Sequence, residues 1–175
     1  MISTLEYINP GTLSDAVDFG NVLVALQYFT GTSNGVNDRG VFAGGSGFLN
    51  TIQYFTCSTP GNTIDFGNLD TGVAQGGAGS NGTTDRGFWS GGGIGPDVPT
   101  DVIQYITISS PGNATDQGNL VRARDYCAAL SNGTNDRGIN ATGRTFSPEV
   151  MRREIDYWTI SSTGNAADFG ALTDI

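Results

Sequence analysis

The sequence contains no histidine and no lysine, and its only basic side chains are eight arginines. Histidine is the side chain that most often serves as a general base or as a transition-metal ligand, and lysine is a common covalent catalyst. Neither of the two cysteines has a plausible base nearby in the sequence. We therefore predict a protein that is not an enzyme and that uses no cofactor and no metal ion.

Positive charge is also scarce, since 17 acidic residues against eight arginines give a formal net charge of −9. An acidic chain gains nothing from the release of counterions by DNA or RNA, so we expect no nucleic-acid partner. The sequence has no run of 18 apolar residues, and its first ten residues have neither the basic nor the apolar region of a signal peptide. We expect no membrane insertion and no secretory signal.

Cysteine is rare as well, and the two cysteines, Cys57 and Cys127, occupy different positions of the repeat described below. Each replaces a residue that is mostly apolar in the other copies. We therefore predict two buried free thiols and no disulfide.

What the sequence does contain is one unit written several times. The segments SNGVNDRG, SNGTTDRG and SNGTNDRG occupy residues 33–40, 80–87 and 131–138. A second half-unit appears four times, with a tyrosine always 11 residues before the aspartate of a D-x-G triplet. Each of the first three of these aspartates lies 15 residues before the next SNG serine. Such fixed spacing indicates a repeat architecture.

The repeat unit has the features of β-strands. No window shows helical periodicity, and the strand-like segments carry bulky residues on both faces, as in residues 103–108. Strands that are apolar on both faces need cover on both sides, which four-stranded units stacked face to face provide. We predict one all-β domain, 1–175, with a half-repeat followed by three four-stranded repeats. The predicted boundaries are 5–20, 21–68, 69–118 and 119–175.

The SNGxxDRG segment is predicted to be a hairpin turn, because Asn-Gly favours the positive φ that tight turns require. The aspartate can bond backbone amides or pair with the neighbouring arginine. A calcium role is the alternative, but one carboxylate per turn supplies few oxygen ligands. The residues of this structural signature are Asn34, Asp38, Arg39, Asn81, Asp85, Arg86, Asn132, Asp136 and Arg137.

The order of these elements resembles the kelch repeat of β-propellers. The segments AGG at 43–45 and SGGG at 90–93 stand where that family has its double glycine. The third copy departs from the pattern with NATG at 140–143, and Gln117 interrupts the aromatic series of the fourth strand. The phrasing Y-x-T-I-x-S-x-G-N-A-x-D-F-G followed by SNGxxDRG is similar to kelch-like repeats in structural proteins of tailed bacteriophages. This resemblance implies a non-enzymatic virion protein for assembly or host-surface attachment, made in the host cytoplasm and located in the virion.

Closed propellers typically have four to eight blades, and this chain supplies three and a half. A partial ring exposes sheet faces on both flanks. We therefore predict that other chains complete the ring, either a second copy of this chain or other virion proteins.

Two loops differ in length between repeats, at 90–101 and 142–154, and variable loops on a rigid scaffold are the usual recognition surface. An anionic or acidic partner, or a glycan on a host surface, would use their arginine and aromatic side chains. The alternatives are a solvated loop with incidental charge and a carbohydrate-binding module. A glycoside hydrolase is the weakest alternative, because the aspartates recur in every unit whereas a catalytic pair is normally unique. The predicted partner-binding residues are Trp89, Arg144, Phe146, Arg152 and Arg153.

Overall fold

The computed structural model describes residues 2–146 and 148–174, and all the regular structure in those ranges is β-strand. The prediction of an all-β chain is therefore confirmed. No helix within the described residues has the length and hydrophobicity needed to cross a membrane.

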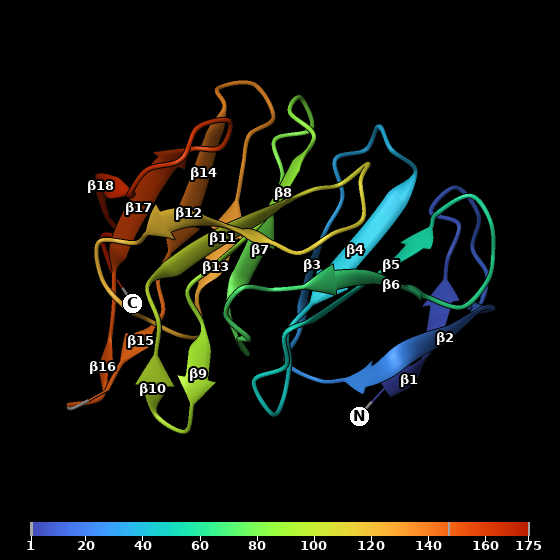
Figure 1. Ribbon diagram of the computed structural model, residues 1–175, viewed down its shortest axis with the longest axis horizontal. Coiled ribbons are helices and arrows are strands. Elements are labelled where there is room, and N and C mark those ends of the chain that lie inside the picture. The colour runs from blue at the N-terminus through green and yellow to red at the C-terminus, as the bar shows by residue number, and fades with distance from the viewer. Residues whose placement is uncertain (1, 147, 175) are drawn as a thin grey trace.

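Three four-stranded antiparallel sheets form most of the molecule (Figure 1). The first sheet contains β3 (Thr30–Thr32), β4 (Arg39–Ala43), β5 (Thr51–Thr56) and β6 (Ile64–Asn68). The second sheet contains β7 (Gly77–Gly79), β8 (Arg86–Ser90), β11 (Val102–Thr107) and β12 (Thr115–Asn119). The third sheet contains β13 (Ala128–Leu130), β14 (Arg137–Ala141), β17 (Glu154–Thr159) and β18 (Ala167–Ala171).

Two strands precede these sheets and two short hairpins complete the chain. The N-terminal hairpin consists of β1 (Ile2–Tyr7) and β2 (Val17–Leu26), which pair with each other and with no other described strand. The two variable loops are not irregular, because each folds into a small hairpin of its own. These hairpins are β9 (Gly93–Gly95) with β10 (Val98–Pro99), and β15 (Arg144–Thr145) with β16 (Val150–Met151).

The sheets are stacked side by side like the segments of a fan (Figure 1). Their first strands, β3, β7 and β13, are neighbours in the middle of the fan. The three SNGxxDRG turns lie at one end of the molecule, and the β9–β10 and β15–β16 hairpins lie at the opposite end. The predicted equivalence of the three turns as hairpin tips is therefore confirmed.

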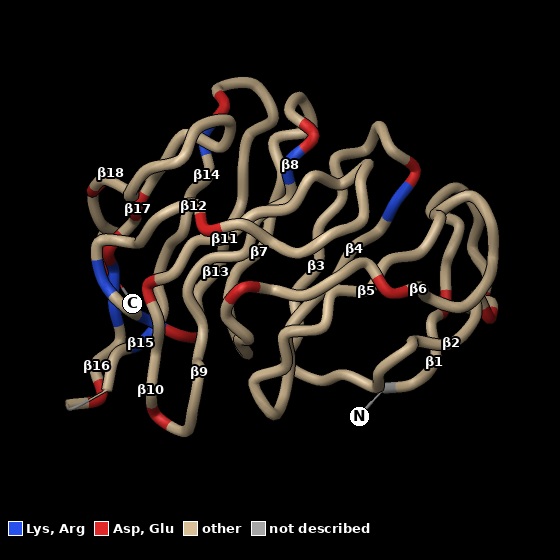
Figure 2. The backbone as a smooth tube through the Cα atoms, in the orientation of Figure 1, with Lys and Arg blue, Asp and Glu red and all other residues tan. Residues whose placement is uncertain are grey.

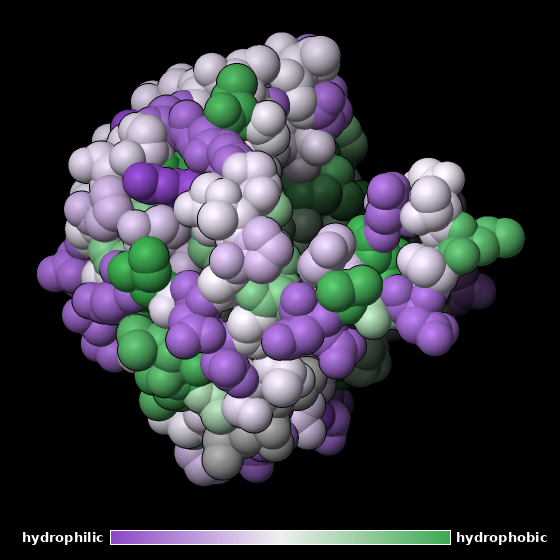
Figure 3. Space-filling model, turned by 90° about the vertical axis from the view of Figure 1, so that its right-hand side faces the viewer, coloured by the Kyte–Doolittle hydropathy of each residue, from purple (hydrophilic) through white to green (hydrophobic). Residues whose placement is uncertain are grey.

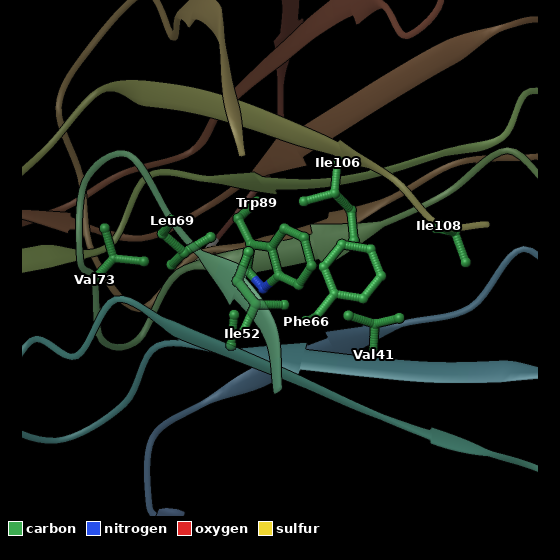
Figure 4. Close-up of a cluster of buried hydrophobic side chains, with 9 residues drawn as sticks. Val41, Ile52, Phe66, Leu69, Val73, Trp89, Ile106 and Ile108 are labelled. Atoms are coloured by element: carbon green, nitrogen blue, oxygen red, sulfur yellow. The ribbon is translucent and has the colours of Figure 1, made fainter. Parts of the chain in front are cut away.

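Hydrophobic side chains fill the space between consecutive sheets, as strands that are apolar on both faces require. Between the first and second sheets, Val41, Ile52 and Phe66 pack against Trp89 and Ile106 (Figure 4). A second cluster between the second and third sheets joins Phe88 and Ile103 to Trp158 and Ile160. Each sheet therefore depends on its neighbour for the burial of one face.

The glycine of the D-x-G triplet is explained by close contact between sheets. Gly67 has a φ of +142°, and a Cβ placed on it would lie 2.4 Å from the carbonyl oxygen of Gly112 in the turn of the next sheet. Neither this backbone conformation nor this space accepts a side chain. The same contact recurs between Gly20 and Gly61 and between Gly118 and Gly164.

The two cysteines are free, as predicted, but only one of them is buried. Cys127 is enclosed near Asn140 and the carbonyl oxygen of Ser90. The prediction that Cys57 is buried is wrong, because Cys57 is exposed. Its counterparts Ile108 and Ile160 are covered by the preceding sheet, whereas only the N-terminal hairpin precedes Cys57.

Candidate interaction surfaces

The SNGxxDRG turns act as clamps between sheets, and Figure 2 shows their paired red and blue segments at three hairpin tips. The carboxylate of Asp85 accepts hydrogen bonds from the amide and the hydroxyl of Ser109 in its own sheet. It also accepts hydrogen bonds from the side-chain amides of Asn34 and Asn37 in the first sheet. Asn81 donates in the same way to Asp136, at 2.9 Å.

The arginine of the signature also joins consecutive sheets. The guanidinium of Arg86 lies 3.9 Å from the centre of the Tyr105 ring and donates a hydrogen bond of 2.7 Å to the carbonyl oxygen of Ile160. Arg39 repeats this arrangement over Tyr54 and toward the carbonyl oxygen of Ile108. Because the aspartates are occupied by neutral donors, the geometry agrees with a structural role for the signature. The described residues contain no group of three or more His, Cys, Asp or Glu side chains that could hold a metal ion.

These contacts stop at the third sheet. Asn132 bonds only the backbone of its own turn, and among the described residues no carboxylate accepts its side-chain amide. Around Gly170 no atom of another described residue, apart from its chain neighbours, lies within 4 Å of the position of a Cβ, although its φ of +138° is close to the +142° of Gly67. The third sheet thus carries the asparagine and glycine with which the other sheets contact the next sheet, but no described sheet follows it.

The outer face of the third sheet is apolar and open. Phe169 is 54 % exposed, whereas Phe66, at the same position of the first repeat, is 3 % exposed. Leu130 and Leu172 are also exposed on this C-terminal flank. When an apolar side chain is exposed in one repeat but buried at the same position of the other repeats, its surface is expected to bind a partner.

A second surface lies at the end of the molecule that carries β9–β10 and β15–β16. A cavity of about 210 Å³ is lined there by Tyr28, Phe48, Gln75, Asp125 and Arg144, among others. Tyr28, Gln75 and Tyr126 hold the same repeat position and all have positive φ, at 60°, 61° and 50°. Side chains held in this conformation by the surrounding structure are concentrated at binding sites.

Arg144 is the electrostatic centre of this cavity. Its guanidinium forms ion pairs with Asp125 at 3.1 Å and Glu149 at 3.0 Å, and it lies over the rings of Tyr126 and Phe146. The hydrogen bond to Asp125 raises the pKa of Arg144, so the side chain stays charged. The site combines a fixed cation, carboxylate oxygens and aromatic faces, which is suited to hydrogen-bonding a polar ligand.

Comparison with known proteins places the fold but not a family. No family model matches the sequence, and no curated protein matches it. The solved structure of YjhT is similar to 98 % of this chain, with a TM-score of 0.79 and 14 % sequence identity. At this identity the likeness shows a shared β fold alone. This chain spans 63 % of the YjhT chain, so a sizeable part of the YjhT fold has no counterpart here.

The predicted partner-binding residues do not form one patch. Arg144 lines the cavity just described and stacks on Phe146, whereas Arg152 and Arg153 line a separate cavity of about 260 Å³ with Met151. Arg152 donates to the hydroxyl of Thr145, and Arg153 donates to the carbonyl oxygen of Thr173. The three arginines are close in the sequence, but Arg144 lines one cavity and Arg152 and Arg153 line another.

The prediction that Trp89 contacts a partner is wrong. Its ring is completely buried between the first and second sheets (Figure 4), and its Nε1 donates to the carbonyl oxygen of Thr30. The glycines that follow Trp89 form the turn after β8, and they leave the tryptophan itself inside the strand.

Sequence reasoning missed a buried polar group that occurs only in the third repeat. Arg124 and Asp156 form an ion pair of 3.0 Å with both side chains inaccessible to solvent. The corresponding residues of the second repeat are Val73 and Gln104, and Gln104 bonds the backbone of Thr71 instead. The signal available in the sequence was that both positions change together in one repeat.

Proposed function

We propose that this chain is a segment of a kelch-like β-propeller that serves, without enzymatic activity, as a structural protein of a tailed-bacteriophage virion. Its role is in assembly or in attachment to the host surface. The repeat phrasing and the stacked four-stranded sheets support this proposal. The observation that carries it is the bare C-terminal flank, where Phe169 is exposed at a position that is buried in the other repeats.

A structural protein with such a flank should associate through it. We expect sedimentation of the purified chain to reveal an oligomer, and we expect Phe169→Asp to weaken it, because a charged side chain on this flank is costly to bury against a partner. The change should leave folding intact, since the side chain is more than half exposed. A chain that stays monomeric at high concentration and joins no purified virion protein would contradict the proposal.

The location in a particle needs its own test. Mass spectrometry of purified virions that encode this sequence should detect its peptides at a stoichiometry typical of a structural component. Detection only in the lysate of infected cells, and not in the particles, would overturn the virion part of the proposal.

A carbohydrate-binding role is the second candidate, and the cavity around Arg144 favours it. Aromatic rings with nearby carboxylate, amide and guanidinium groups are the chemistry that binds sugar rings and their hydroxyls. Binding to a glycan array that is lost in Arg144→Ala and retained in Arg153→Ala, which changes an arginine outside this cavity, would favour this candidate. The absence of any glycan binding by the folded chain would remove it.

A further inference from the structure

A strongly apolar hollow lies between the N-terminal hairpin and the first sheet. It has a volume of about 490 Å³, and its lining includes Leu5, Leu26, Phe29, Phe42 and Phe55. Figure 3 views the molecule from this side and shows green atoms in a recess beside a protruding lobe. An open apolar cavity of this size costs stability unless another group fills it.

The repeat itself shows what fills the equivalent place elsewhere. In the second sheet, Trp89 and Ile108 occupy the positions of Phe42 and Cys57, and both are completely buried in a cluster that includes Val41 and Ala43 of β4 as well as side chains of β5 and β6. Trp89 also donates to the carbonyl oxygen of Thr30 in β3. The corresponding position in front of the first sheet holds no such strand pair, and there Cys57 is exposed. The hollow therefore has the position of a missing first and second strand.

The edge of β1 leads to the same conclusion. Its counterparts β5, β11 and β17 each pair with a strand on both sides, whereas β1 has β2 as its one partner among the strands that the structure describes. The free side of β1 is the side on which β4, β8 and β14 pair in the complete sheets. Unpaired backbone groups along such an edge form a template for an added strand.

Polar acceptors mark the register that an added hairpin would adopt. In the complete interfaces, Asn34 donates to Asp85 and Arg39 donates to the carbonyl oxygen of Ile108. The corresponding acceptors in front of the first sheet are the Asp38 carboxylate and the Cys57 carbonyl oxygen. Among the described residues, the Asp38 carboxylate accepts hydrogen bonds only from Ser58, and no residue of the N-terminal hairpin donates to either acceptor.

We propose that this slot binds a β-hairpin of the first-and-second-strand type of this same repeat. The hairpin pairs with β1, fills the cavity over Phe42 and Phe55, and places its SNG asparagine on Asp38 and its DRG arginine on the carbonyl oxygen of Cys57. The inference rests on the proposed function, because it names the partner that completes one end of the array. A second copy of this chain does not fit the slot, since each of its three such hairpins is already inside a four-stranded sheet.

The test adds the hairpin to the whole chain. Residues 28–50, which contain β3, β4 and the natural loop to β5, are placed directly before Met1, so the added hairpin is held at a high effective concentration. We expect alkylation of Cys57 by a maleimide to slow about tenfold or more, because a covered thiol reacts only when the cover opens. Cys127 serves as an internal reference in both proteins.

Two pairs of variants separate specific docking from nonspecific contact. An added hairpin with Asn34→Ala and Arg39→Ala should give less protection, because it lacks the two donors of the register. In the receiving chain, Leu5→Asp should remove protection, whereas the same change at the fully exposed Leu13 should not. Equal protection in all of these variants would overturn the proposal.

The remaining outcomes are also decisive. An unchanged alkylation rate in the fusion would overturn the proposal, and so would protection of Cys57 in the unfused chain that rises with its own concentration, since a second copy would then fill the slot. Loss of association through Phe169, with Cys57 still protected in the fusion, would leave the slot standing and remove the assembly function. If the chain associates through Phe169 but Cys57 is not protected in the fusion, the assembly function stands and the proposed hairpin slot is wrong.

Discussion

The guanidinium of Arg124 lies 3.0 Å from the carboxylate of Asp156, and both side chains are completely buried in the third repeat. Arg124 also donates to the side chain and the backbone carbonyl of Asn140, and Asp156 accepts a hydrogen bond from the amide of Val121. The pair thus ties the segment that enters the third sheet to β14 and β17. In the second repeat the segment that enters the sheet is held without charges, by the burial of Val73 and by hydrogen bonds between Gln104 and the backbone of Thr71.

Breaking this pair should be costly, but exchanging it as a unit should cost less. Asp156→Gln alone leaves a buried unpaired cation and should lower the free energy of unfolding by about 3–5 kcal/mol, and Arg124→Val alone leaves a buried unpaired carboxylate with a similar effect. The double variant R124V/D156Q carries the second repeat's residues at these two positions and should be more stable than either single variant in urea unfolding, although Asn140 stays in place of its counterpart Trp89. A double variant no more stable than the single variants would contradict this account.

The repeat explains why much of the fold was predictable. Fixed spacing between Tyr, D-x-G and SNG identified the strand order and the equivalent hairpin tips, because each copy faces the same packing problem. The Asn-Gly turns and the strands that are apolar on both faces specify local geometry, and they occur in each copy of the repeat. A structural role for Asp85 followed from the same repetition.

Two kinds of feature could not be predicted from the sequence. One is a residue pair that departs from the repeat pattern in a single copy, and the other is burial that depends on whether a sheet lies next to the residue. The Arg124–Asp156 pair occurs once, so the repeat shows that both positions change together but not that the two side chains are in contact. Phe88 and Trp89 fit the pattern of a strand that is apolar on both faces, but the glycine run after Trp89 suggested a loop, so the tryptophan was predicted at the surface. The exposure of Cys57 and Phe169 follows from the absence of a neighbouring sheet in space, although the repeat gives both positions buried counterparts.

Gly67 and Gly170 provide a matched pair, because they have the same repeat position and nearly the same φ. Alanine at either position should cost about 1 kcal/mol of backbone strain. Only Gly67→Ala also brings a Cβ to 2.4 Å from the carbonyl oxygen of Gly112, so it should lose about 1–3 kcal/mol more in thermal or urea unfolding. Equal losses in the two variants would show that contact between sheets does not determine this glycine.

The two thiols should differ sharply in reactivity. Partial burial and the negative charge of Asp38 raise the pKa of Cys57, so its thiolate fraction at neutral pH is lower than that of an unperturbed cysteine. We expect Cys57 to be alkylated slowly in the native protein, faster as the pH rises, and faster in Asp38→Asn because the charge is removed. Cys127, whose pKa burial also raises, should react only when the chain unfolds. Rapid native alkylation of Cys127 would contradict the structure.

The arginines of the hairpin tips give the last prediction. Arg86 stacks on Tyr105 and donates to the carbonyl oxygen of Ile160 in the next sheet. Arg137 stacks on Tyr157, but no further sheet follows it among the described residues.

Lysine keeps the charge and loses the planar stacking and the fixed donor geometry. Arg86→Lys should therefore lower the free energy of unfolding by about 1–2 kcal/mol, and Arg137→Lys by about 0.5 kcal/mol or less, since only the first variant breaks a bond between sheets. Urea unfolding of the two variants measures the difference. If Arg137→Lys proved as costly as Arg86→Lys in the isolated chain, the arginine would stabilise its own sheet and not the junction. If its cost rose only in the assembled protein, the third sheet would be using Arg137 as the first two sheets use Arg39 and Arg86.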